Sequence, residues 1–261
     1  MPGYPALQKR IGRLLRGPNA VQEHPDRRHE QPRSLIEPAT HNGQKRAHLS
    51  EVDVFASLSD REKDWLLHNT TMITYRKGHV FYRPDQPGEV IFILKTGRVD
   101  LFRQSEEGRK LVVENVRPHT IFGEMGFLGQ RMYGCHAQAA AESLICVMSR
   151  TDMTGLIVRN PGVGLRLLAD MGDRLREREH ELEALAFQAL PTRLAALLLR
   201  EMDGAGNVTG LTHQDLADRL GSRRETVSQM LGRFRDEGLV RIESRKVSVL
   251  DRGDLERYVD R

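Results

Sequence analysis

Apolar residues recur with helical spacing on both sides of a single glycine, Gly221. Before it, Leu216 and Leu220 are four residues apart and follow Thr212, a residue type that caps helix N-termini. Gly221 allows a tight turn with a positive φ, which other residues adopt poorly. Ala217 stands four residues before this glycine, where two crossing helices touch and need a small side chain. The pattern predicts a helix-turn-helix.

The second helix of this pair has one apolar face and one polar face. Val227, Met230 and Leu231 form the apolar face, and Ser222 stands where the helix cap is expected. The polar positions are Arg223, Arg224, Glu225, Ser228 and Gln229. Such side chains can reach base edges and phosphates in the major groove of DNA. An ordinary solvated helix face is the alternative, but the spacing, the glycine and the small residue together favour a recognition helix.

A basic β-hairpin is predicted after this helix. The runs Leu239–Ile242 and Val247–Leu250 flank the turn Glu243–Lys246. Its cations are Arg241, Arg245 and Lys246. A hairpin here is the wing of a winged helix, so we expect residues 190–261 to form a DNA-binding domain, with a further helix over Thr192–Met202. The expected contacts with the DNA backbone are Thr212, Ser222, Arg223, Thr226, Arg245 and Lys246.

Residues 50–150 have the composition of short strands separated by glycines. They predict a β-sandwich or β-roll, preceded by a short helix after Ser59 with Glu62 as its capping-box partner. Val99 and Leu101 alternate with Asp100 and Phe102, which predicts a half-buried strand. The expected strands are Met72–Arg76, Val80–Arg83, Val90–Leu94, Val99–Arg103, Lys110–Val113 and Ser143–Met148.

Residues 151–189 are predicted to form a long helix. Leu168, Leu175 and Leu182 follow one another at intervals of seven residues, and Ala189 continues the series. This row could pack on its own domain or form one seam of a two-helix coiled coil. The dense charge on the other faces favours a homodimer, in which two recognition helices contact two half-sites of palindromic DNA. The expected seam is Leu168, Met171, Leu175, Leu182 and Leu185.

Residues 1–49 differ from the rest of the chain. They contain six prolines, nine Lys and Arg residues and only four Asp and Glu residues. We expect a mostly disordered basic tail. Leu7, Ile11, Leu14 and Leu15 could instead form a short basic amphipathic helix that contacts a membrane surface, serves as a targeting peptide or adds a DNA contact.

Composition narrows the class of protein. Hydrophobic residues make up 39% of the chain and charged residues 29%, with a net charge of only +4, so any DNA-binding surface depends on local clustering of cations. No apolar run approaches the ~20 residues that span a bilayer. Cys135 and Cys146 are too few for a disulfide framework, which favours the cytoplasm. Neither a phosphate-binding loop nor a nucleophile elbow occurs, so an enzyme is disfavoured.

The predicted β-roll, long helix and winged helix-turn-helix together give an α+β fold that resembles the CRP/FNR family, that is, the cyclic-AMP receptor protein, the fumarate-nitrate regulator and their relatives. The resemblance covers roughly residues 50–252. It rests on KTGRVDL around Gly97, Phe122–Gly126, Leu185–Phe187 and, most specifically, Arg224–Ser228. It implies base contacts by Arg224, Glu225, Ser228 and Gln229, where the glutamine replaces a common arginine, and RNA polymerase as a further partner.

The resemblance also implies an effector site in the β-roll. Gly123 and Glu124 match the pair that holds the ribose of a cyclic nucleotide, whereas the pair expected to hold its phosphate falls on Tyr133 and Gly134. A cyclic phosphate needs a charge-assisted partner, so cyclic AMP in its usual pose is disfavoured. The positions that face adenine in cyclic-AMP sensors are occupied here by Arg178 and Glu179, which are bulky and charged rather than small hydroxyl residues. The full candidate site is Gly123, Glu124, Met125, Arg131, Tyr133, Gly134 and Arg178, and its effector is unknown.

Two alternatives to an effector-controlled DNA-binding regulator are considered. Cys135 and His136 could serve a haem- or redox-responsive regulator, but a small buried thiol and an exposed strand histidine are the favoured explanation. The cysteine cluster of iron–sulfur members is absent. A sensor module that regulates a protein partner is the other alternative, but the polar helix face and the basic wing favour DNA.

Overall fold

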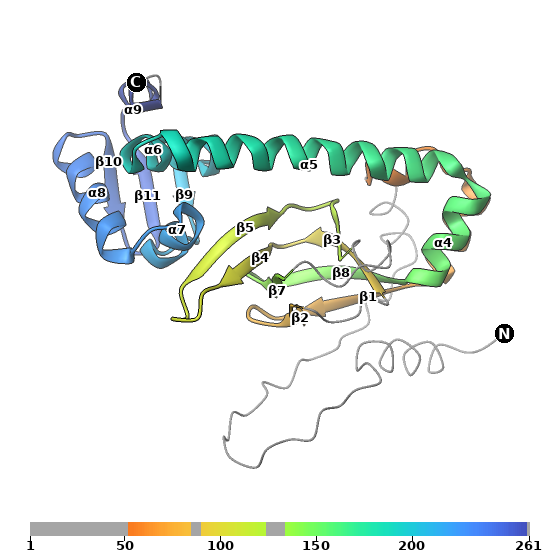
Figure 1. The fold of residues 1–261 in the computed structure, drawn as a ribbon. Coiled ribbons are helices and arrows are strands. Elements are labelled where there is room, and N and C mark those ends of the chain that lie inside the picture. The colour runs from red at the N-terminus through yellow and green to blue at the C-terminus, as the bar shows by residue number, and fades with distance from the viewer. Residues whose placement is uncertain (1–51, 85–89, 124–133, 260–261) are drawn as a thin grey trace, which may run out of the picture. The chain divides into compact units, whose positions relative to one another are not determined.

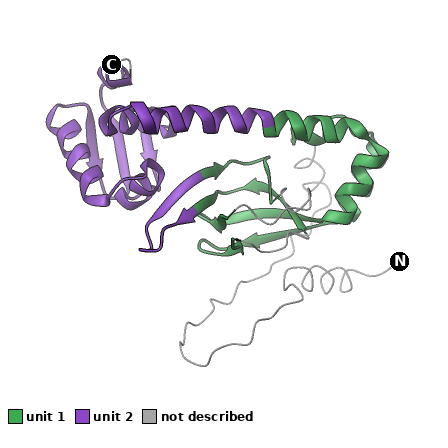
Figure 2. Cartoon of the chain, viewed as in Figure 1, with its two compact units in different colours: residues 1–102, 114–171 green, residues 103–113, 172–261 purple. Residues whose placement is uncertain are grey.

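The computed structural model describes residues 52–84, 90–123 and 134–259. The expected tail, 1–49, and the effector-site candidates Glu124, Met125, Arg131 and Tyr133 lie outside the described residues. Contacts divide the chain into two compact units (Figure 2). The first contains residues 1–102 and 114–171, and the second contains residues 103–113 and 172–261. Among the described helices, none has the length and apolar character needed to cross a bilayer.

Two four-stranded antiparallel sheets form the β-roll (Figure 1). Their strand orders are β1-β8-β3-β6 and β2-β7-β4-β5. The strands are β1 (Thr70–Tyr75), β2 (Val80–Tyr82), β3 (Val90–Thr96), β4 (Val99–Gln104), β5 (Lys110–Val116), β6 (Ile121–Phe122), β7 (His136–Ala139) and β8 (Ser143–Ser149). The predicted α+β fold is therefore confirmed, and each of the six predicted strands has an observed counterpart. The sequence did not indicate β6 and β7, which are two and four residues long and too short to show an alternation.

The sheet β1-β8-β3-β6 is buried on both faces. Along β8, Ile145 and Val147 face the core between the sheets, whereas Cys146 and Met148 face a second core. This second core is covered by the helices α3 (Asp60–His68), α4 (Arg150–Arg159) and the start of α5 (Pro161–Phe187). As predicted, α3 begins with a capping box formed by Ser59 and Glu62. These hydrogen bonds also lower the pKa of the Glu62 carboxyl group.

The predicted burial pattern of β4 is wrong. Asp100 and Phe102 are both buried, and Leu101 is half-buried. Asp100 accepts a hydrogen bond from the side chain of Asn115 at 2.7 Å. Phe102 stacks on the ring of His136 with centroids 4.9 Å apart. Asn115 and His136 therefore cover the face of β4 that carries Asp100 and Phe102, so this face is buried as well.

Gly97 fixes the tight connection between β3 and β4. Its φ is +94°, and an added Cβ would lie 2.2 Å from the carbonyl oxygen of Glu142. The glycine is therefore required both by its backbone conformation and by the close approach of another chain segment.

The single long helix predicted over residues 151–189 is two helices. α4 ends at Arg159, Asn160 has a non-helical backbone, and α5 begins at Pro161. A proline disfavours helical conformation in the residue before it and fits well at the start of a helix, which explains the break. α5 ends at Phe187, so Ala189 does not continue the heptad row but caps the next helix.

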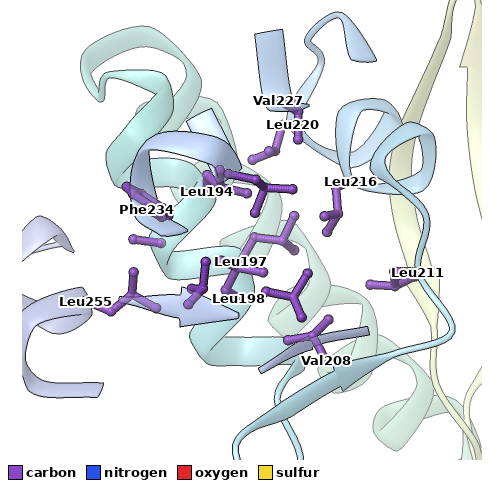
Figure 3. Close-up of a cluster of buried hydrophobic side chains, with 14 of the residues drawn as sticks. Leu194, Leu197, Leu198, Val208, Leu211, Leu216, Leu220, Val227, Phe234 and Leu255 are labelled. Atoms are coloured by element: carbon purple, nitrogen blue, oxygen red, sulfur yellow. The ribbon is translucent and has the colours of Figure 1, made fainter. Parts of the chain in front are cut away.

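The second unit holds the predicted winged helix-turn-helix. Its elements are α6 (Leu190–Glu201), β9 (Asn207–Thr209), α7 (His213–Leu220), α8 (Arg224–Asp236), β10 (Val240–Glu243), β11 (Lys246–Val249) and α9 (Arg252–Val259). Leucines of α6 meet Leu216, Val227 and Phe234 in one core (Figure 3). β9 and α9 were not predicted from the sequence. β9 pairs with β11 and makes the wing three-stranded.

Candidate DNA-binding surface

The first helix of the helix-turn-helix begins and ends as predicted. The Thr212 hydroxyl accepts a hydrogen bond from the Asp215 amide at 3.1 Å, and Asp215 Oδ2 accepts one from the Thr212 amide at 2.8 Å. At the other end Gly221 has a left-handed backbone with φ +59°, and its amide donates to the carbonyl of Ala217. Ala217 is completely buried, in line with its predicted place at the helix crossing.

The predicted cap of the recognition helix is wrong by one residue. Arg223 occupies the cap position of α8, and its side chain makes no capping hydrogen bond. Ser222 still belongs to the turn, because its amide donates to the carbonyl of Ala217 at 3.0 Å. The left-handed turn at Gly221 therefore extends one residue further than the sequence pattern indicated.

α8 separates a buried face from an exposed one. Val227, Leu231 and Phe234 are 0% exposed, at positions one and two helical turns apart. On the other side, the exposed residues at the start of the helix are Arg223, Arg224, Glu225, Thr226 and Gln229. Arg224 and Ser228, like Glu225 and Gln229, are four residues apart and lie above one another on this face.

Ser228 differs from its neighbours on this face. It is half-buried, and its hydroxyl oxygen lies 2.8 Å from Nδ1 of His213, the first residue of α7. His213 was not predicted from the sequence, because the two partners are fifteen positions apart and give no local signal. The structure thus brings one predicted base-contacting side chain into a hydrogen bond with the first helix of the motif.

Two arginines connect the helix-turn-helix to α6. The Arg219 Nη1 atom lies 2.8 Å from Glu201 Oε2, with the side chains only 5% and 17% exposed. Arg193 Nη1 donates a hydrogen bond to the carbonyl of Leu220 at 2.8 Å. Burial lowers the pKa of the Arg193 guanidinium. These contacts fix both the side and the end of α7 on the helix that precedes it.

The wing has a tighter turn than predicted. Glu243 pairs with Lys246, so only Ser244 and Arg245 connect β10 to β11. Arg245 has a left-handed φ of +56° and an exposed side chain, and its carbonyl accepts a hydrogen bond from Gly210. Arg241 is also exposed, whereas Lys246 is half-buried and lies 4.0 Å from Glu243.

The described part of the expected effector site is small. Gly123 is buried directly after β6, and Gly134 is exposed before β7. Arg178 lies on α5, where its guanidinium pairs with Glu181 of the same helix.

Cys135 and Cys146 are both buried and neither forms a disulfide. His136, predicted to be an exposed strand residue, is half-buried against Phe102. Within the described ranges, no three His, Cys, Asp or Glu side chains form a group that could hold a metal ion.

The leucine row on α5 is exposed in the single chain. Leu168, Leu175 and Leu182 are 64%, 61% and 66% exposed, and Leu185 is 45% exposed. Met171, which was predicted to belong to the same seam, is half-buried against the second core of the β-roll. The row therefore forms an apolar stripe on a helix that is otherwise rich in charged residues.

Known protein families match both parts of this architecture. The model of the cyclic nucleotide-binding domain matches residues 72–160, and the model of the Crp-like helix-turn-helix domain matches residues 192–258. A protein named cyclic AMP receptor protein from Thermus thermophilus is 32% identical over 205 residues, which cover 78% of this chain and 94% of the relative. The chain belongs to the CRP/FNR family.

Further CRP/FNR relatives support this assignment. The CRP-like cAMP-activated global transcriptional regulator of Mycobacterium tuberculosis is 28% identical over 217 residues, covering 80% of this chain and 97% of the relative. The fold matches a crystal structure of a CRP/FNR transcriptional regulator from Eubacterium rectale with a TM-score of 0.69, at 21% identity, covering 80% of this chain and 98% of the other. This CRP/FNR member is a transcription regulator that binds DNA through its helix-turn-helix.

Proposed function

We propose that α8 enters the DNA major groove and selects the sequence through Arg224, Glu225, Ser228 and Gln229. The observation that carries this proposal is the division of α8 into a fully buried apolar face and a polar face on which Arg224, Glu225 and Gln229 are exposed and Ser228 is half-buried. A guanidinium such as that of Arg224 can donate two hydrogen bonds to guanine. The carboxylate of Glu225 can accept from the amino group of cytosine, and the amide of Gln229 suits adenine.

Contacts with phosphate would set the position of α8 in the groove. The exposed side chains of Arg223 and Thr226 stand beside the base-contacting face, and Arg245 is exposed at the tip of the wing. Ser222 and Lys246 are half-buried, so we expect weaker contributions from them. The Thr212 side chain is engaged in the capping box, which leaves one lone pair of its hydroxyl for a phosphate-bound water.

We propose that the active form is a homodimer joined along α5. Leu168, Leu175 and Leu182 form a row that is more than 60% exposed in one chain, and a second copy of the helix would cover it. Two copies related by a twofold axis would present two α8 helices to half-sites about one helical turn of DNA apart. The expected target is therefore palindromic double-stranded DNA.

Regulation would come from an effector in the β-roll domain. An effector can shift the dimer toward its DNA-binding arrangement only if it binds that arrangement more tightly. The two relatives named above are called a cyclic AMP receptor protein and a cAMP-activated regulator. In this chain, Tyr133 and Gly134 replace the phosphate-holding pair, so we favour another effector or another pose. The regulator would act on DNA in the cytoplasm, with RNA polymerase as a further partner and no catalytic reaction of its own.

Selection from a random duplex library tests this function. The full-length protein, with and without cell extract as a source of effector, is expected to enrich a palindromic sequence. Its affinity for that sequence should fall steeply with salt, because phosphate contacts release counterions. Enrichment of no sequence at moderate ionic strength would favour the alternative of a sensor module that acts on a protein partner.

A further inference from the structure

The hydrogen bond between His213 and Ser228 connects the two helices of the motif at their polar surface. His213 is the first residue of α7, and Ser228 lies on α8 four residues after Arg224. Their side-chain atoms Nδ1 and Oγ are 2.8 Å apart. Both residues are half-buried, whereas Arg224, Glu225 and Gln229 around Ser228 are exposed. The pair therefore lies at the edge of the surface that is proposed to meet the bases.

This contact restricts what the Ser228 hydroxyl can offer to a base. A serine hydroxyl has one proton to donate and two lone pairs, and it rotates freely when it has no partner. If Nδ1 accepts the proton, only lone pairs remain for the base; if Nδ1 donates, the proton remains available. In either case one hydrogen-bonding direction of the hydroxyl is occupied by His213, which restricts the orientations that the hydroxyl can offer to a base. A side chain that is held in one orientation discriminates between bases better than one that can rotate to suit each of them.

We propose that His213 is a positioning residue for DNA sequence recognition, and that it fixes the orientation and the hydrogen-bonding role of the Ser228 hydroxyl. The inference rests on the proposed contact between α8 and the bases. It assigns part of the sequence preference to the first helix of the motif, through a residue that need not touch a base itself. The unit that discriminates at this position is the pair of His213 and Ser228 rather than the serine alone.

Four variants of the full-length protein test the pair: His213→Ala, Ser228→Ala, the double variant, and His213→Asn. An asparagine places an amide atom close to where histidine has Nδ1, so it can restore the hydrogen bond without the ring. Gln214→Ala is the matched control, because Gln214 is the next residue of α7 and its side chain donates to Asp218 on the same helix. Each variant is titrated with the duplex selected by the wild type and with its single-base substitutions, after its thermal unfolding has confirmed that it is folded.

The two single alanine variants are expected to lose discrimination at the same base pair, each by about twofold to tenfold, the factor that one hydrogen bond typically contributes. The double variant should lose no more than either single variant, and His213→Asn should recover most of the wild-type preference. Gln214→Ala should keep the ranking of bases. Loss in His213→Ala that is equal for all bases, or losses that add fully in the double variant, would overturn the proposal. A wild-type protein without any sequence preference would instead overturn the proposed function.

Discussion

Arg193 of α6 donates a hydrogen bond from Nη1 to the carbonyl of Leu220, the last residue of α7, over 2.8 Å. The last carbonyls of a helix have no partner within the helix, and an unpaired buried carbonyl destabilises the fold. Gly221 turns the chain away at the next residue with φ +59°. The arginine therefore supports the end of α7 at the point where the chain enters the turn before the recognition helix.

Replacing Arg193 by methionine is expected to destabilise the second unit. Methionine keeps an unbranched apolar stem but cannot donate to the Leu220 carbonyl. The loss should be about 1.5–3 kcal/mol, the range for a hydrogen bond to a charged group. Urea denaturation of the full chain measures it. Arg200→Met on the same helix is the control: within the described residues Arg200 makes ion pairs of 3.6 Å with Glu181 and Glu201, and its loss should stay within about 0.5 kcal/mol. Equal losses in both variants would contradict the capping role.

Arg224→Ala is expected to weaken binding to the selected DNA by about 1–3 kcal/mol and to relax the preference at one position of each half-site. The physical reason is the loss of a bidentate contact with a base. Arg235→Ala provides a matched control, since Arg235 is also exposed on α8 but pairs with Asp236 near its far end. Fluorescence anisotropy with substituted duplexes distinguishes the two variants. An unchanged base preference in Arg224→Ala would show that this residue contacts only the backbone.

The local pattern was sufficient where the structure depends on near neighbours in the chain. The capping box at Ser59, the cap at Thr212, the left-handed Gly221 and the buried Ala217 were each predicted from residues within five positions of one another. The same holds for the apolar face of α8, whose residues recur at helical spacing. Most of these features define the helix-turn-helix. DNA binding could therefore be predicted from the C-terminal part of the sequence.

Contacts between distant residues could not be predicted in this way. The partners Arg193 and Leu220, or His213 and Ser228, are 27 and 15 residues apart and give no periodic signal. The burial of Phe102 likewise depends on His136, on a strand that is too short to be indicated by alternation. The end of α4 before Pro161 is a different case: the proline is a local signal, but the prediction of one helix over residues 151–189 rested on a leucine spacing that begins only after this proline.

Acid is expected to destabilise the β-roll through His79. Burial lowers the pKa of this imidazole below its ordinary value of 6.5, and its ring lies 4.2 Å from that of Tyr75. The unfolded chain therefore binds the proton at a higher pH than the folded one. Stability is fully retained above about pH 6.5 and is lost as the pH falls from there toward the folded-state pKa.

Urea midpoints measured on both sides of this window test the assignment. His79→Phe keeps a ring in the cluster and should reduce the loss of stability between about pH 7 and about pH 5. Phe81→Leu is the control, because Phe81 packs 5.1 Å from His79 but does not titrate. It should lower stability at every pH and leave the slope unchanged. An undiminished slope in His79→Phe would assign the acid sensitivity to other groups.

Cyclic AMP at millimolar concentration is expected to raise the melting temperature by less than about 2 °C. By the resemblance, Tyr133 and Gly134 are expected to occupy the positions where the family holds the cyclic phosphate, so we expect the anion to lack its charge-assisted partner. Differential scanning fluorimetry measures the shift, and Tyr133→Arg, which supplies a cation, should increase it. A large saturable shift with the unaltered protein would show that the phosphate is held by other residues.

Leu175→Glu is expected to separate the proposed dimer and to abolish tight binding to palindromic DNA. Leu175 is the middle residue of the exposed row on α5, and a carboxylate there would face its own copy across a twofold seam. Arg176→Glu introduces the same side chain one position along, about 100° around the helix, and removes only an exposed pair with Asp173. That control should remain a dimer in sedimentation velocity, whereas Leu175→Glu should sediment as a monomer. Because two linked α8 helices bind two half-sites far more tightly than one, the monomer should retain only weak binding to a single half-site. If both variants stay dimeric, the leucine row is not the seam and the exposed stripe needs another partner.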